Sequence, residues 1–205
     1  MMKNQQEIAT PKSLSANAND ANSISQKNKQ SPTKKITYLA TFTALSTALK
    51  VFGNYISFIP TIKFNLHILV WYMSTVVMDP FKGGLVAGIS DILGQLVFPQ
   101  PGSTGFNPLI TIGNICNALS FGLVFKYVPI KNEPIKAILA GIVSACVGTL
   151  GINTLATFLM QTPDKAMPYI PFLISRLPQL LISTTNVVLF CLLIPLCKRL
   201  KKNLE

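Results

Sequence analysis

Arg176 interrupts an otherwise apolar run at residues 168–181, and this position constrains what the chain can fold into. A guanidinium group keeps its proton and is costly at membrane depth, so it must face a bundle interior, a carboxylate or a bound anion. The alternative is a position near a helix end, from which the side chain reaches the lipid headgroups. Pro171 and Pro178 favour the interior, because they break the helical hydrogen bonding and bring backbone carbonyls towards a cavity. Arg176 is therefore a candidate binding residue.

The chain as a whole contains few charged residues. Hydrophobic residues make up 49% of the 205 residues and charged residues 12%, against ~25% charged residues in an ordinary soluble domain. We therefore expect an integral membrane protein. The net charge of +11 lies mostly outside the apolar segments, so it indicates topology and headgroup contact rather than nucleic-acid binding.

Six apolar segments follow a polar tail. Residues 1–33 are rich in Asn, Ser, Gln and Lys and predict a disordered cytoplasmic tail. Residues 34–205 are expected to form an all-α membrane protein domain, a compact bundle of six transmembrane helices with both termini cytoplasmic. The predicted segments are 34–51, 64–78, 84–98, 108–127, 135–160 and 169–197. The second and third are short against the ~20 residues of a perpendicular span, so strong tilt or a re-entrant hairpin remains an alternative.

The sidedness follows from the basic residues. An even number of spans places both termini on one side, and the ends at Lys34–Lys35 and 198–202 are basic, as is the stretch 126–136. Cytoplasmic ends carry the excess of Lys and Arg. The opposite, outer loops are less basic, although Lys50 and Lys63 are expected to lie there.

The first segment carries alanines at every fourth position, Ala40, Ala44 and Ala48. This alanine row lies on one helical face, where another helix can approach closely. One interpretation is docking of a partner membrane subunit. The alternative is packing against the protein's own helices.

A second stripe combines small and polar residues. Gly84, Gly88, Asp91 and Gln95 follow one another at spacings of four, three and four, so they share a face of the third segment. The carboxylate of Asp91 is the expected partner of Arg176.

Polar residues on several segments predict a pocket. They are Asp91, Gln95, Asn114, Asn117, Arg176 and Gln179. Burial of such groups is costly unless each is paired, which indicates a ligand with many donors and acceptors. Interhelical hydrogen bonds are the alternative, and the uncharged stretch 99–107 is expected to be a lid.

Enzyme signatures are absent from the sequence. It contains no GxxxxGK[ST], HExxH or GxSxG motif, so no enzyme activity and no cofactor are predicted. The single histidine, His67, has no second histidine with which to share a metal. The four cysteines show no paired ligand spacing, so we predict no metal site.

From Lys34 to Lys202 the chain resembles the S components of energy-coupling-factor (ECF) vitamin transporters, their substrate-binding membrane subunits. The resemblance rests on the alanine row, the segment GGLVAGISDILGQLVFP at 83–99, the short lid and the basic cytoplasmic ends. The segment PFLISRLPQLL at 171–181 resembles the Arg-Leu-Pro-containing last helix of the folate-specific members. The long polar N-terminal tail departs from the family pattern.

The resemblance implies a mechanism in the bacterial cytoplasmic membrane. An S component binds its vitamin from outside, docks on a transmembrane coupling subunit driven by two ATP-binding subunits, and topples to release the ligand inward. The alanine row would then be the docking face.

Folate agrees with the residues of the predicted pocket. Asp91, Gln95 or Asn114 would suit the donor and acceptor edge of a pterin ring, and Trp71 or Phe106 would stack on it. The anionic glutamate would pair with Lys63 or Arg176, beside Gln179.

Three alternatives remain open at this point. The first is an S component for thiamine, riboflavin or a queuosine precursor. An independent secondary transporter would show inverted repeats, and we find no convincing internal repeat. A small intramembrane enzyme would need a nucleophile and a base that the sequence does not show.

Overall fold

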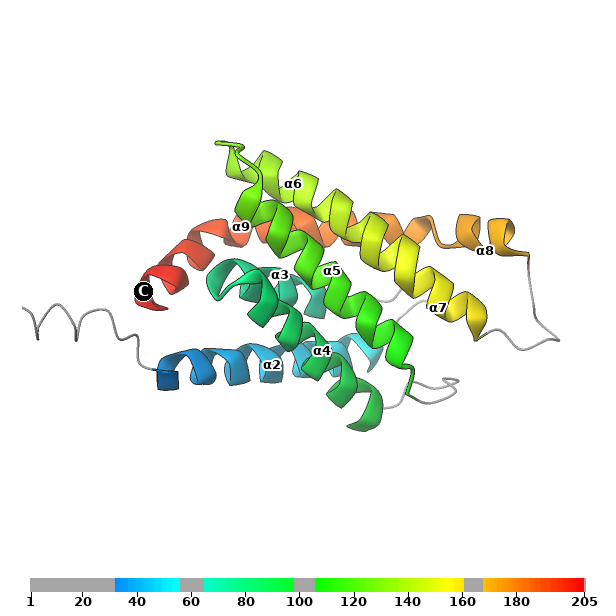
Figure 1. Ribbon diagram of the computed structural model, residues 1–205, viewed down its shortest axis with the longest axis horizontal. Coiled ribbons are helices and arrows are strands. Elements are labelled where there is room, and N and C mark those ends of the chain that lie inside the picture. The colour runs from blue at the N-terminus through cyan, green and yellow to red at the C-terminus, as the bar shows by residue number, and fades with distance from the viewer. Residues whose placement is uncertain (1–31, 56–64, 98–105, 161–167, 205) are drawn as a thin grey trace, which may run out of the picture.

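A computed structural model describes residues 32–55, 65–97, 106–160 and 168–204 (Figure 1). All regular elements within these residues are helices, which confirms the predicted all-α class. The elements are α2 (Pro32–Tyr55), α3 (His67–Val77), α4 (Pro80–Val97), α5 (Pro108–Tyr127), α6 (Glu133–Ser144), the π-helix η1 (Ala145–Asn153), α7 (Thr154–Leu159), α8 (Tyr169–Ser175) and α9 (Pro178–Leu204). The predicted tail, Lys63 and most of the predicted lid lie outside the described residues.

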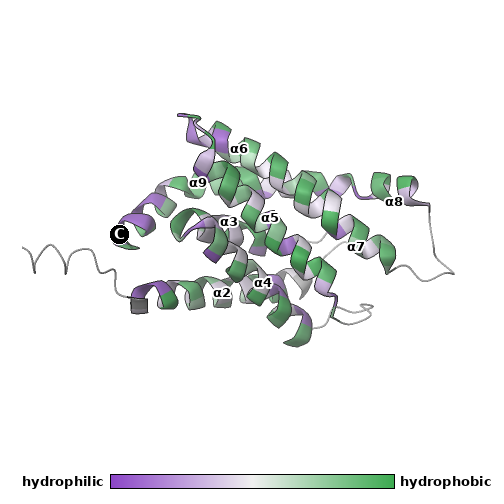
Figure 2. Cartoon of the chain, viewed as in Figure 1, coloured by the Kyte–Doolittle hydropathy of each residue, from purple (hydrophilic) through white to green (hydrophobic). Residues whose placement is uncertain are grey.

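These elements group into six helical rods. The elements α6, η1 and α7 run on as one rod, and α8 and α9 form another that is interrupted at Arg176 and Leu177. Within the described part of the chain, four stretches are long and apolar enough to cross a membrane: Thr33–Gly53, Pro108–Tyr127, Glu133–Leu159 and Tyr169–Leu204. Hydrophobic residues predominate along much of these rods (Figure 2). Six complete spans remain a prediction, because α3 has 11 residues against the ~20 of a perpendicular span.

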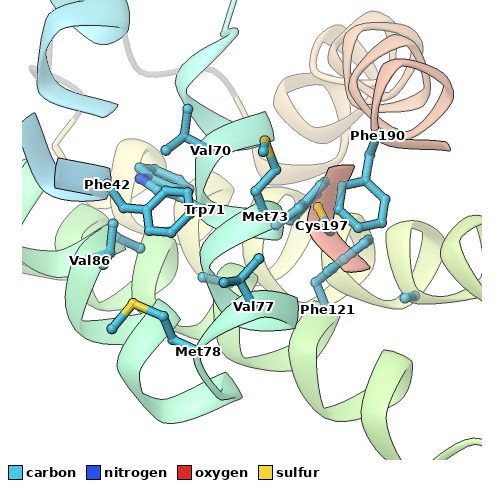
Figure 3. Close-up of a cluster of buried hydrophobic side chains, with 14 of the residues drawn as sticks. Phe42, Val70, Trp71, Met73, Val77, Met78, Val86, Phe121, Phe190 and Cys197 are labelled. Atoms are coloured by element: carbon cyan, nitrogen blue, oxygen red, sulfur yellow. The ribbon is translucent and has the colours of Figure 1, made fainter. Parts of the chain in front are cut away.

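The short helix α3 forms the centre of the bundle. It packs against α2, α4, α5 and α9. Val70, Trp71 and Tyr72 are at most 2% exposed. Figure 3 shows Val70 and Trp71 among buried side chains from the surrounding helices. The Tyr72 ring stacks on Phe121 with their centroids 3.8 Å apart. A helix that is buried on all sides gains its stability from packing, so α3 needs no full membrane span to be stable.

Both termini of the described helices lie at one end of the bundle. The start of α2, the turn between α3 and α4, the connection from α5 to α6 and the end of α9 gather there (Figure 1). Two exposed ion pairs tie this end together, Lys126 to Asp79 at 3.0 Å and Lys198 to Glu133 at 2.9 Å. The arrangement agrees with termini on the same side, and the cytoplasmic assignment remains a prediction.

The close approach of α3 and α4 at Gly83 allows a test of this packing. A Cβ atom at Gly83 would overlap Thr75 Cγ2 and lie 2.6 Å from the Thr75 Cα. We expect Gly83→Ala to lower the free energy of unfolding by about 1–3 kcal/mol, although alanine has the higher helix propensity. The measurement is thermal unfolding in detergent. The control is Gly151→Ala, whose Cβ has its nearest neighbour at 3.2 Å; equal effects of the two substitutions would contradict the close approach.

Candidate ligand-binding site

Asp91 is the centre of a buried polar cluster that joins three helices. Its side chain on α4 is 1% exposed and forms an ion pair with Lys50 on α2. The other carboxylate oxygen accepts hydrogen bonds from Thr111 Oγ1 on α5, at 2.7 Å, and from Gln95 Nε2. Lys50 Nζ also donates to the Asp91 backbone carbonyl at 3.3 Å. The negative charge is thus compensated within the bundle.

This pairing corrects two predictions. The expected ion pair between Asp91 and Arg176 is not formed, because Lys50 occupies the carboxylate. Lys50 does not lie in an outer loop: α2 continues to Tyr55, and the lysine is 7% exposed. A Cβ atom at Gly94 would lie 2.7 Å from Lys50 Cδ, so the glycine makes room for the lysine stem. Thr43, Ser46 and Lys50 follow one another at spacings of three and four residues, so they share one buried face of α2. This spacing could have predicted from the sequence that Lys50 is buried.

The predicted stripe on α4 faces α5. Cβ atoms at Gly84 and Gly88 would each lie 2.9 Å from a side chain of α5, Leu119 and Ile115 respectively. Asp91 and Gln95 lie one and two turns further along α4, and both form hydrogen bonds with Thr111 of α5. Gln95 Oε1 accepts from the Asn107 backbone N–H at 3.0 Å. The stripe therefore combines close packing with the polar cluster, as its spacing predicted.

The start of α5 is fixed beside this cluster. Asn107 is 5% exposed, and its Oδ1 caps the helix by accepting from the Leu109 N–H at 2.9 Å. The preceding Phe106 is 43% exposed. Its ring is therefore accessible next to the buried polar residues.

Trp71 lies deeper in the bundle than ligand stacking would require. The indole is 1% exposed, and Nε1 donates to Ser90 Oγ at 3.0 Å. His67 packs edge-on against it with ring centroids 4.7 Å apart. Ser46 donates to the same Ser90 hydroxyl at 3.1 Å. Since the Trp71 ring is enclosed, Phe106 is the better placed of the two aromatic candidates.

Arg176 lies at the break between α8 and α9. The helix is interrupted just before Pro178, since α8 ends at Ser175 and α9 begins at Pro178, whereas Pro171 lies in the first turn of α8 and does not break it. The half-buried guanidinium group contacts Gln179 Oε1 at 3.4 Å and lies 5.1 Å from the centroid of the Phe172 ring. Among the described residues, no carboxylate forms an ion pair with it. The structure thus brings Arg176 and Gln179 together. Neither of them takes part in the hydrogen bonds to Asp91.

The two asparagines of α5 have different partners. Asn117 belongs to a buried network in which it accepts from Ser144 at 2.6 Å and donates to Thr149 at 3.2 Å. It therefore follows the alternative of interhelical hydrogen bonding. Asn114 accepts from Asn153 Nδ2 at 2.9 Å. In the described part of the chain, the buried Oδ1 of Asn153 has no hydrogen-bond partner, and sequence reasoning did not single out this residue.

Comparison with known proteins agrees with this architecture. The model of the family described as ECF-type riboflavin transporter, S component, matches residues 30–202. The chain belongs to this family. No curated protein and no solved structure matches the chain.

Family membership assigns the general role. This S component is the vitamin-binding subunit of an ECF transporter, and its family is not an enzyme family. Its apolar helices agree with a multi-pass membrane protein. The family implies a vitamin as substrate and the ECF module as partner.

The alanine row of the S component faces outward. Ala40, Ala44 and Ala48 are all exposed on α2, as are the neighbouring Thr37 and Thr41. Within the described residues, no other helix covers the alanine row. The outer face of α4 is different, because it carries large side chains such as Leu85 and Leu96.

The buried ion pair predicts an asymmetric response to mutation. Lys50→Met leaves the Asp91 carboxylate uncompensated and is expected to lower the free energy of unfolding by about 3–5 kcal/mol. Adding Asp91→Asn removes the unpaired charge and should recover part of this loss. Thermal unfolding of ligand-free protein in detergent measures both effects.

A surface pair provides the matched control. Lys126→Met removes the exposed pair with Asp79 and should destabilise the protein far less, because solvent screens an exposed pair. If Lys50→Met were no more harmful than Lys126→Met, the ion pair would not be a determinant of stability.

Proposed function

We propose that this S component binds folate or a reduced folate. The observation that carries the proposal is the half-buried Arg176 guanidinium group, which has no carboxylate partner among the described residues. A cation within an apolar segment requires an anion or a polar cavity. Folate supplies carboxylates through its glutamate, whereas riboflavin is uncharged at neutral pH.

The other end of the ligand would meet the polar cluster. Asp91 is engaged by Lys50, Gln95 and Thr111, so its main role would be to hold these donors in place. Gln95 and Asn114 would present amide groups to the edge of the pterin, and the exposed Phe106 ring would stack on its face. Gln179 and Lys63 complete the proposed set at the glutamate end. Riboflavin is the second candidate, because the matching family is described by it.

Ligand binding by purified protein tests this choice. Isothermal titration with folate, 5-formyltetrahydrofolate, riboflavin and thiamine is expected to give a nanomolar dissociation constant for a folate, about −12 kcal/mol at 1 nM. Thiamine, a cation, should bind far more weakly. Tight binding of riboflavin without a response to either folate would identify riboflavin as the ligand and leave the S component role unchanged.

A truncated ligand separates the contacts at the pterin end of folate from those at its glutamate end. Arg176→Ala should weaken folate binding by about 2–5 kcal/mol but leave the binding of 6-hydroxymethylpterin, which lacks the glutamate, unchanged. Asp91→Asn should weaken both ligands. Arg199→Ala, which removes the other arginine, is the matched control. Equal losses for both ligands in Arg176→Ala would show that the arginine supports the fold rather than the glutamate.

We also propose that the alanine row binds the transmembrane coupling subunit of the ECF module. Small outward side chains allow a partner helix to approach closely, so Ala44→Trp should abolish co-purification with the coupling subunit and vitamin uptake. Ligand binding by the isolated protein should persist. Leu85→Trp on the outer face of α4 is the control and should assemble normally. Loss of ligand binding together with assembly would indicate a folding defect instead.

A further inference from the structure

The last helix is longer than a membrane requires. It has 27 residues, from Pro178 to Leu204, which corresponds to about 40 Å of helix against a hydrocarbon core of about 30 Å. Pro195 lies inside it, about 26 Å from Pro178 at the same rise per residue. The final turns bend from the helix axis towards the start of α2 (Figure 1). A proline is the expected cause of such a bend, and its distance from Pro178 is close to the thickness of the hydrocarbon core.

The segment beyond the bend is amphipathic. Cys197 and Leu204 are 1% and 8% exposed and belong to the hydrophobic core, and the partly buried Leu200 packs against that core. Their spacing, three and four residues, places them on one helical face. Cys197 and Phe190 belong to the same cluster of buried side chains (Figure 3). The apolar side of residues 196–204 is thus already occupied by the protein itself.

The opposite side of the same segment is basic. Lys198, Arg199, Lys201 and Lys202 are all exposed, and they appear as the hydrophilic end of α9 (Figure 2). Lys198 pairs with Glu133, and within the described residues the other three form no ion pair. One further carboxylate side chain, Glu205, follows this segment in the sequence. A cationic surface therefore remains next to the bend.

Lys34 and Lys35 extend this surface at the same end of the bundle. They belong to the first turn of α2, and the C-terminal end of α9 turns towards this helix (Figure 1). The bend, the anchored apolar side and the surplus of cations meet at the level expected for headgroups.

We propose that residues 196–204 bind the headgroups of anionic phospholipids and fix the protein at the membrane surface. Each Lys or Arg near such a surface contributes about 1 kcal/mol, and the contribution falls off within a Debye length. Because the apolar side is held by the core, the basic side presents its charges in a fixed arrangement. The binding is independent of the vitamin.

Lipid competition on the full-length protein tests the proposal. Protein in neutral detergent is incubated with equimolar phosphatidylglycerol and phosphatidylcholine, and the retained lipids are counted by native mass spectrometry. Retention of phosphatidylglycerol is expected to exceed that of phosphatidylcholine by at least about fivefold, as several headgroup contacts imply. Raising NaCl from about 50 mM to about 500 mM should reduce this preference.

Two variants with equal numbers of substitutions separate charge from shape. The variant K198Q, R199Q, K201Q and K202Q should lose the preference, and the variant K198R, R199K, K201R and K202R, which keeps every charge, should retain it. Equal retention of both lipids by the wild type, or an undiminished preference in the glutamine variant, would overturn the proposal. Thermal stabilisation by inorganic phosphate equal to that by phosphatidylglycerol would also overturn it, because it would indicate a site for soluble anions.

Discussion

The ion pair between Lys50 and Asp91 sets the arrangement of the helices around it. Two charges buried at 7% and 1% exposure are stable only when they face one another and their remaining donors and acceptors are satisfied. Thr111 and Gln95 supply those hydrogen bonds, so α2, α4 and α5 are tied to one point. With Lys50 turned inward, the rotation of α2 about its axis is fixed, and the alanine row is left on the outer face. A single polar contact thereby connects the proposed ligand site to the proposed docking face.

The buried polar residues divide into groups with different roles. Asn117, Tyr72, Ser144 and Thr149 hydrogen-bond to each other across the bundle, so their burial is explained by structure. The same account is incomplete for Asn153, whose buried Oδ1 lacks a partner among the described residues, and for the guanidinium group of Arg176. A bound ligand would stabilise such groups most, because it could supply the hydrogen-bond or charge partners that the fold does not provide.

The last rod combines three environments in one stretch of chain. Its beginning is broken at Arg176, its middle packs through Phe190 into the aromatic core, and its end bends at Pro195 and becomes basic. Prolines produce both changes of direction, because each removes a backbone donor from the helical ladder. The apolar middle keeps the two polar ends apart.

The sequence by itself determined the all-α class, the approximate helix bounds, the break at Arg176 and the stripe of α4 that faces α5. These features depend on composition, local periodicity and proline, which act within a few residues. Tertiary structure decided which cation pairs with Asp91, that Lys50 is buried, and that Trp71 is enclosed while Phe106 is exposed. Two cations, Lys50 and Arg176, were available for one carboxylate. The outcome depends on the rotation and depth of every helix, and these are set by contacts across the whole bundle.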